Sequence, residues 1–170
     1  MTRKEVTDPR AGLSGFAYPV AIITVRNGEK QNGMTAAWIT QISITPKIYA
    51  VSIGLTRYTH DLMEKSPSFG INLLSDDQAY ISRLFGIASG RKKDKLKDPL
   101  VKTYEAGSMD CPMMEGCILN LECRKIGANT YGDHTIFVGE AKRIEFDEDK
   151  KPLLYHNMRY YSLGKFLLDR

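Results

Sequence analysis

Short apolar runs separated by turn residues form the hydrophobic pattern of the chain. The runs are rich in Val, Ile and aromatic residues, which is typical of β-strands. They predict strands over Val20–Val25, Met34–Ile42, Ile48–Ile53, Phe69–Leu74, Thr135–Glu140 and Ala141–Phe146. From Cys117 to Arg124 apolar and polar residues alternate. This alternation predicts a strand with one core-facing side, formed by Cys117, Leu119, Leu121 and Cys123, and one wet side.

Only two short segments have helical features. The Thr59 hydroxyl can cap a helix over His60–Lys65, and Ser75 with the two following Asp residues opens a second helix that ends near Gly86. Turns or connections are predicted at Asn27–Gly28, Gly86–Pro99, Tyr131–His134 and Asp147–Lys151. Strict strand–helix alternation is missing, which argues against a doubly wound parallel sheet. The pattern predicts a mainly β, mostly antiparallel barrel with short helices, in a single domain over residues 1–170.

Composition and length fit an ordinary globular domain. The chain has 170 residues, 42% of them hydrophobic and 26% charged, enough for one full-sized core. No apolar run approaches the roughly 20 residues that span a bilayer. Residues 1–10 are polar and lack the apolar core of a signal peptide, so we expect a cytoplasmic protein without membrane contact. Neither a G-x-G-x-x-G nor a Walker motif occurs.

Charge and cysteine patterns exclude other classes. The net charge is +4, and its main local source, Arg91–Lys97, is expected to be solvated. No aromatic residue interrupts this run, so nucleic-acid binding is not expected, whereas a small phosphate needs only a few cations. Cys111, Cys117 and Cys123 are odd in number and six residues apart, so neither a metal site nor a catalytic thiol is expected. The Met-rich loop Ser108–Met114 either lines a substrate mouth or simply packs.

The stretch Asn32–Ser43 is the main candidate for chemistry. It places small and hydroxyl side chains around a single tryptophan, just after a turn signal. A flat ligand such as a flavin ring needs backbone amides at its polar edge and little bulk over its face. The alternative is a strand whose small residues pack under a helix. Arg57 and Thr59 then add a guanidinium beside a helix start, a combination that suits a phosphate.

Together these residues resemble the flavin reductase family of FMN-binding split-barrel proteins. The resemblance covers roughly three-quarters of the chain. The matching segments are Tyr18–Thr24, Asn32–Ser43 followed by Pro46, Arg57–His60, Phe69–Leu73, Phe85–Gly86, Ser89–Arg91 with Asp94–Lys95, and Gly132–Glu140. The resemblance implies a Greek-key antiparallel split barrel that forms homodimers. It also implies FMN, or else FAD, bound near the dimer interface, with NAD(P)H as co-substrate.

The resemblance also implies which residues bind the cofactor. They are Thr35, Ala36, Ala37, Trp38, Thr40, Ser43, Arg57, Thr59, His60, Arg91 and Lys95. The backbone amides of residues 35–38 would hold the polar edge of the ring, and Arg57 and Thr59 the phosphate. Arg91 and Lys95 either close over the phosphate or face water. A lone strand tryptophan is most often a core residue, and we expect Trp38 to pack or stack near the ligand without a chemical role. Tyr160 and Tyr161 either cover the ring or pack as ordinary aromatics.

The implied activity is NAD(P)H-dependent reduction of flavin or, through flavin, of ferric complexes or a redox partner protein. Hydride transfer between stacked rings needs placement more than acid–base chemistry, so no catalytic side chain is expected. His134 either orients the nicotinamide or is a solvated turn histidine. Two alternatives stay open: a flavoredoxin-like electron carrier without direct NAD(P)H turnover, and a non-catalytic barrel that binds another macromolecule. The choices between NADH and NADPH and between FMN and FAD also stay open.

Overall fold

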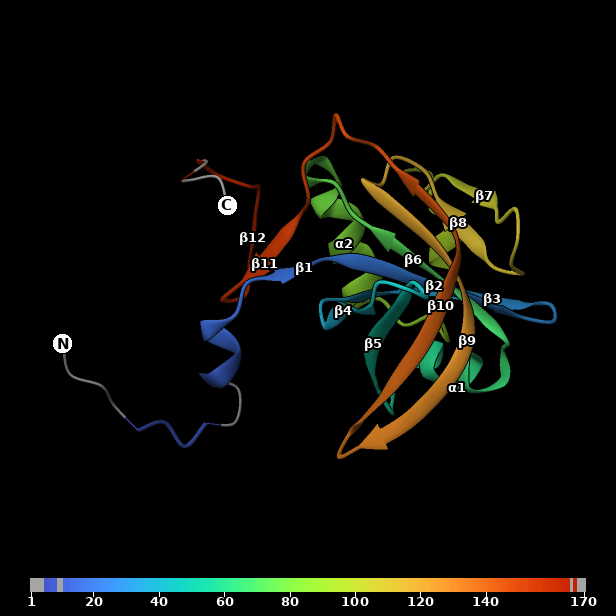
Figure 1. Ribbon diagram of the computed structural model, residues 1–170, viewed down its shortest axis with the longest axis horizontal. Helices are drawn as coiled ribbons and strands as arrows, with labels where there is room; N and C mark the ends of the chain where they lie inside the picture. Colours follow the sequence, from blue (N-terminus) through green and yellow to red (C-terminus); the bar gives the residue numbers. More distant parts are fainter. Residues whose placement is uncertain (1–4, 9–10, 166, 168–170) are drawn as a thin grey trace.

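Seven antiparallel strands form the body of the protein, in a computed structural model that describes residues 5–8, 11–165 and 167 (Figure 1). Their order across the sheet is β3 (Lys30–Ala36), β2 (Ala21–Asn27), β6 (Ser68–Leu73), β9 (Leu119–Tyr131), β10 (His134–Phe146), β5 (Ile48–Gly54) and β4 (Ile39–Ser43). The two helices are α1 (Tyr58–Lys65) and α2 (Ala79–Ile87). The prediction of a mainly β fold with short helices is confirmed.

The two edge strands of this sheet, β3 and β4, are consecutive in the sequence. Only Ala37 and Trp38 separate them. The three residue steps from Ala36 to Ile39 span at most about 11 Å, so the edges must approach each other there and the sheet must curl into a barrel. The predicted single strand over Met34–Ile42 is therefore wrong. The β2–β3 ladder ends at Ala36 and the β4–β5 ladder begins at Ile39, a break that a continuous run of strand-forming residues hides.

Smaller elements surround the barrel. A three-stranded sheet of β1 (Tyr18–Pro19), β11 (Leu154–His156) and β12 (Arg159–Tyr161) lies at one side, to the left in Figure 1. A hairpin of β7 (Thr103–Glu105) and β8 (Pro112–Met114) lies at the other side. Short 3-10 turns are η1 (Ala11–Gly15), η2 (Asp76–Gln78) and η3 (Lys95–Lys97). Among the described residues, no helix has the length and apolar character needed to cross a bilayer.

Strand β2 separates two hydrophobic clusters. Ile23 and its alternate neighbours pack inside the barrel with Phe69 and Phe137. Ile22 belongs to the second cluster, which lies against α2 and contains Phe85. Both faces of β2 are buried, which agrees with the nearly continuous apolar run Val20–Val25, whose one polar residue, Thr24, is also buried.

Strand β9 differs from the prediction of one wet face. Leu121 and Cys123 are buried as expected, but Asn120 and Glu122 on the opposite face are buried as well. The β7–β8 hairpin and its loop cover them. Asn120 donates to the Met114 carbonyl over 2.9 Å, and Glu122 accepts from the backbone N–H groups of Gly107 and Ser108. Alternation alone does not reveal that a distant loop folds over a polar face.

The sulfur-containing residues have structural roles. Cys111, Cys117 and Cys123 are buried, and burial raises the pKa of each thiol to about 12. The thiols therefore stay protonated at neutral pH, which agrees with the expectation of no catalytic cysteine. Met113 and Met114 are also buried, so these two residues of the Met-rich loop pack in the interior.

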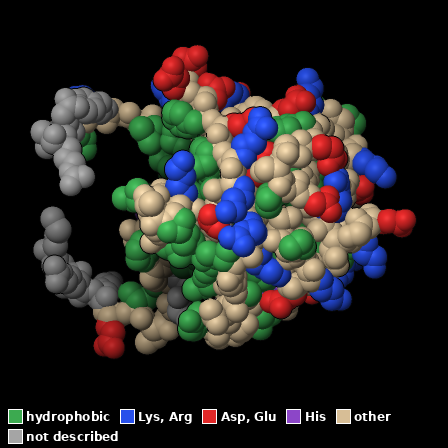
Figure 2. Space-filling model, turned by 45° about the vertical axis from the view of Figure 1, so that its right-hand side comes forward, with side chains coloured by type: hydrophobic (Ala, Val, Ile, Leu, Met, Phe, Trp, Pro, Cys, Tyr) green, Lys and Arg blue, Asp and Glu red, His purple; other side chains and the backbone are tan. Residues whose placement is uncertain are grey.

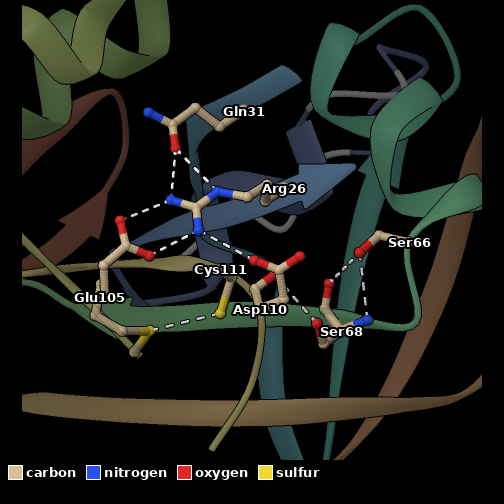
Figure 3. Close-up of polar contacts among 8 residues, drawn as sticks. Arg26, Gln31, Ser66, Ser68, Glu105, Asp110 and Cys111 are labelled. Carbon is tan, nitrogen blue, oxygen red and sulfur yellow. Dashed lines mark hydrogen bonds and ion pairs between the residues drawn. The ribbon is translucent and has the colours of Figure 1, made fainter. Parts of the chain in front are cut away.

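Arg26 on β2 fastens the β7–β8 hairpin to the barrel. Figure 3 shows its guanidinium between Glu105, Asp110 and Gln31. Both terminal nitrogens donate to the Glu105 carboxylate over 2.7 Å, and one also contacts Asp110 at 3.0 Å. The hydrogen bond from Arg26 lowers the pKa of Glu105, so the ion pair persists at neutral pH.

Asn72 on β6 connects three strands through a fully buried side chain. Its amide donates to the Ile22 carbonyl and to Thr24, and its oxygen accepts from the backbone N–H of Met114 and from Asn120. We expect Asn72→Ala to lower the free energy of unfolding by about 3 kcal/mol, because several buried partners lose their hydrogen bonds. Urea denaturation measures this change, with Asn129→Ala on the exposed part of β9 as control. A loss equal to that of the control would contradict the role.

Candidate functional site

A cavity of about 210 Å³ lies between β3, the start of α1 and the loop after α2. Three chain segments line it: the middle of β3, residues 56–59 at the start of α1, and residues 85–91 together with Lys95. Of the predicted cofactor-binding residues, it brings together Thr35, Arg57, Thr59, Arg91 and Lys95. Segments far apart in the sequence thus converge on one pocket.

Thr59 lies inside α1 and is not its cap. The N-cap residue is Arg57, which forms no side-chain cap hydrogen bond, so the predicted capping by Thr59 is wrong. The Thr59 hydroxyl instead accepts a hydrogen bond of 2.8 Å from the Asn32 amide of β3. Both side chains are buried. The bond fixes the first turn of α1 against the edge of the barrel.

Gly90 packs directly on Asn32. A Cβ atom at this glycine would lie 2.1 Å from the Asn32 side-chain oxygen, so any larger residue would displace the amide or the loop. Asn32 and Gly90 are functional candidates that residue-by-residue interpretation of the sequence missed. The available signal was a polar side chain in the middle of a strand, opposite a Ser-Gly-Arg turn.

Lys95 is buried, with only 2% of its surface exposed. The expectation that the whole run Arg91–Lys97 is solvated is therefore wrong at this position. The Lys95 ammonium donates to the carbonyls of Phe85 and Ala88 at the end of α2, the latter over 2.8 Å. Burial and, to a smaller extent, the positive charge of Arg57 lower the pKa of Lys95 to about 8.

Arg57 and Arg91 supply the remaining positive charge of the cavity, and both are exposed. Arg91 reaches from the loop after α2 to the start of α1. There it donates to the Thr56 carbonyl over 3.2 Å and pairs with Asp61, with its guanidinium 5.2 Å above the Tyr58 ring. The cavity therefore combines cationic side chains with the N-terminal end of a helix, an arrangement that suits a phosphate group.

The other predicted cofactor residues lie outside this cavity. Ala37 and Trp38 form the join between β3 and β4 and line an apolar groove of about 480 Å³ toward β11. Trp38 and Thr40 line a second groove of about 350 Å³ along β4. Ala36 ends β3, Ser43 ends β4, and neither lines any of these spaces. The predicted cofactor residues thus do not all converge on one space: five line the cavity, and the others lie at the join, along β4 or in the interior.

Trp38 and His134 pack against each other. Their ring centroids are 4.8 Å apart, and Trp38 is 38% exposed, so it is not a fully buried core residue, and its packing near a ligand stays a prediction. The His134 Nδ1 lies 2.7 Å from the Asp133 carboxylate, which fixes the ring orientation. This hydrogen bond also lowers the pKa of Asp133.

His60 is engaged in the interior of the fold. Its Nε2 lies 2.8 Å from the Thr135 hydroxyl, and its ring packs edge-on against Phe137 at 5.4 Å. It therefore points away from the cavity, whose lining does not include it. Among the described residues no cluster of His, Cys, Asp and Glu could hold a metal ion.

Thr35 connects the edge strand to α2 and the C-terminal hairpin. Its hydroxyl donates to the Ser82 carbonyl over 2.6 Å, and the Ser82 hydroxyl contacts the Tyr160 hydroxyl at 2.9 Å. The Tyr160 hydroxyl therefore contacts α2, and whether its ring also covers a flavin stays a prediction.

Comparison with known proteins identifies one protein family. A family model described as "Flavin reductase like domain" matches residues 13–164. The FMN reductase (NADH) SmoA of Agrobacterium fabrum is 30% identical over 146 residues, which cover 86% of this chain and 79% of the relative.

Two solved structures share the complete barrel. The FMN-binding protein of Thermus thermophilus with bound 1-cyclohex-2-enone superposes with a TM-score of 0.87 at 26% identity, and covers all of both chains. The NADH:FAD oxidoreductase SgcE6 of Streptomyces globisporus, in complex with NAD and FAD fragments, superposes with a TM-score of 0.86 at 25% identity, over 95% of this chain and 98% of the other. The split-barrel prediction is confirmed.

We expect the affinity of the cavity for a phosphate monoester to fall as the pH rises through about 8. Lys95 carries its proton below this pH and loses it above, because its pKa is lowered, and a neutral amine attracts a dianion less. Melting-temperature shifts with phenyl phosphate between pH 7 and 9.5 measure the effect, since the monoester is fully ionised throughout. Lys95→Met should abolish the decline, whereas Lys92→Met in the same loop should keep it. A wild-type shift independent of pH would contradict the assignment.

Proposed function

The chain belongs to the flavin reductase-like domain family, and we propose that it binds FMN and catalyses its reduction by NADH. The observation that carries this proposal is the cavity at the edge of β3, where Arg57, Arg91 and Lys95 surround a helix start. Relatives named as NADH-dependent flavin reductases support the activity. The match over residues 13–164 supports the proposed single-domain organisation.

The residues present fit a flavin phosphate. The absence of a side chain at Gly90 lets the loop pack directly on Asn32, and the buried Asn32–Thr59 pair holds the surrounding segments at fixed positions. Arg57 and Lys95 would bind the phosphate through charge-assisted hydrogen bonds. β3 is an edge strand, so one row of its backbone groups lies outside the ladder near Thr35 and Ala36 and is available to the polar edge of a ring.

When bound, the flavin supplies a ring that accepts a hydride from reduced nicotinamide. The protein would hold the flavin and nicotinamide rings face to face and keep them out of unreactive orientations. The small side chains of Ala36 and Ala37 would leave the face of the ring open. Trp38 and the His134 ring that it contacts would form the adjoining wall and orient the nicotinamide.

The decisive experiment for this function is anaerobic spectroscopy of the purified protein with FMN. Bleaching of the flavin absorbance by NADH, with steady turnover in air, would support the reductase. Bound flavin that NADH does not bleach would favour the flavoredoxin-like electron carrier, and a protein that takes up no flavin would favour the non-catalytic barrel. Ferric complexes as final acceptors stay a prediction, tested by adding ferric citrate to the same assay.

We expect His134→Ala to raise the KM for NADH several-fold while FMN affinity stays nearly unchanged. The ring would contribute to cofactor placement and not to proton transfer, so kcat should change less than kcat/KM. Asp133→Ala keeps the imidazole but removes its partner, and should have a smaller effect in the same direction. Steady-state kinetics with NADH and NADPH measure both. An unchanged KM for both cofactors, or a collapse of FMN binding, would show that His134 has another role.

We also propose a homodimer that covers β4 and the join. Ile42 and Ile44 are 54% and 82% exposed on this edge, beside the exposed Trp38. Figure 2 shows apolar side chains gathered toward the left of the molecule in that view. An unpaired, apolar edge strand is a surface that proteins rarely leave open.

Light scattering should therefore give twice the mass of one chain at micromolar concentration. Ile44→Asp should weaken association by at least about tenfold, by placing a charge in an apolar interface. Lys92→Asp, outside this edge, serves as the control. A monomer with flavin bound would contradict the dimer.

A further inference from the structure

The outer side of the phosphate cavity is crossed by one side chain. Arg91 extends from the loop after α2 to α1, where it contacts the Thr56 carbonyl, the Asp61 carboxylate and the Tyr58 ring. About half of its surface and of that of Asp61 is exposed, at 47% and 45%. The floor of the same cavity is buried: Asn32, Thr59 and Lys95 are each at most 5% exposed. Arg91 thus spans the exposed side of a pocket whose floor is buried.

We propose that Arg91, held by Asp61, closes the phosphate end of this cavity and makes the site selective for FMN over FAD. The inference rests on the proposed flavin binding and adds the identity of the flavin. FMN ends at its phosphate, so its terminal group fits a pocket that is closed beyond it. In FAD the same phosphate continues into a second phosphate and an adenosine, which would have to pass through the position of the Arg91–Asp61 pair.

Charge gives an independent argument for the same selectivity. Arg57, Arg91 and Lys95 line the cavity, and Asp61 is the carboxylate paired with Arg91, so three positive charges and one negative charge leave a balance of two positive charges. A phosphate monoester carries close to two negative charges at neutral pH. The corresponding phosphate of FAD is a diester-like group with a single charge. The charge balance therefore matches the terminal phosphate of FMN.

Family membership does not decide this point. One relative is named as an FMN reductase and a structural neighbour as an NADH:FAD oxidoreductase, so both flavins occur among similar proteins. The selectivity must come from particular residues near the phosphate. Since the Arg91–Asp61 pair is exposed, its contribution is modest. We expect a preference of about tenfold, which corresponds to about 1.4 kcal/mol.

Titration of riboflavin, FMN and FAD by fluorescence tests the proposal with the full-length protein. The wild type should bind FMN about tenfold more tightly than FAD. Arg91→Ala should weaken FMN binding and bring the FAD:FMN ratio of dissociation constants to within about threefold of one. Asp61→Asn keeps the Arg91 guanidinium but removes the carboxylate that holds it. This variant should tighten the binding of FAD relative to that of FMN. Lys92→Ala removes the same charge from the adjacent position and should leave the ratio unchanged.

The outcomes separate this inference from the proposed function. If FAD binds to the wild type as tightly as FMN, or if Lys92→Ala changes the ratio as much as Arg91→Ala, the lid role is overturned while flavin binding stands. If no flavin binds, riboflavin included, the proposed function itself fails and the inference with it. Circular dichroism of each variant checks that the fold is retained, and Arg91→Lys, which retains the charge without the fork, should give an intermediate ratio.

Discussion

The two-residue join between β3 and β4 is the constraint on which the architecture depends. Ala37 and Trp38 connect strands at opposite edges of the seven-stranded sheet, so the sheet has to curl. Closure is incomplete because each edge strand pairs with only one neighbour. The gap between the two edge strands leaves one row of backbone groups of β3 without a strand partner. It also leaves apolar side chains of β4 uncovered. β3, which precedes the join, lines the cavity, and Trp38 within the join contacts His134 at the start of β10.

The short helices depend on the barrel for their order. Helices of eight and nine residues are too short to be stable alone in water. Each has a lysine at its C-terminal carbonyls: Lys125 of β9 donates to Met63 and Glu64 at the end of α1, and Lys95 donates to the end of α2. A cation there is favoured by the helix dipole. Lys95 also lines the phosphate cavity, so the same ammonium links the end of α2 to the ligand site.

The sequence predicted most strands because their pattern is local. Val20–Val25 and Ile48–Ile53 are β-branched runs, and the Gly132–Asp133 turn between β9 and β10 uses a glycine at φ +59°. Long-range contacts were missed: the break at Ala37–Trp38, the burial of Glu122 beneath a loop 14 residues away, and the burial of Lys95. For the site, the motif segments located Arg57, Thr59, Arg91 and Lys95, while Asn32 and Gly90 needed the fold, since their contact joins residues that are distant in the sequence.

The cavity combines a buried floor with exposed arginines, and this division bears on the proposed selectivity. Asn32, Thr59 and Lys95 are buried with hydrogen-bond partners, so moving any of them would leave a polar group unsatisfied. They would therefore fix the position of a phosphate bound in the cavity. Arg57 and Arg91 are exposed, and the Arg91–Asp61 ion pair is weak in water. In the proposed lid role, this pair favours a ligand that ends at its phosphate only modestly. A substitution in the floor should alter all phosphate-bearing ligands alike, whereas a change in the exposed arginines alters the choice among them.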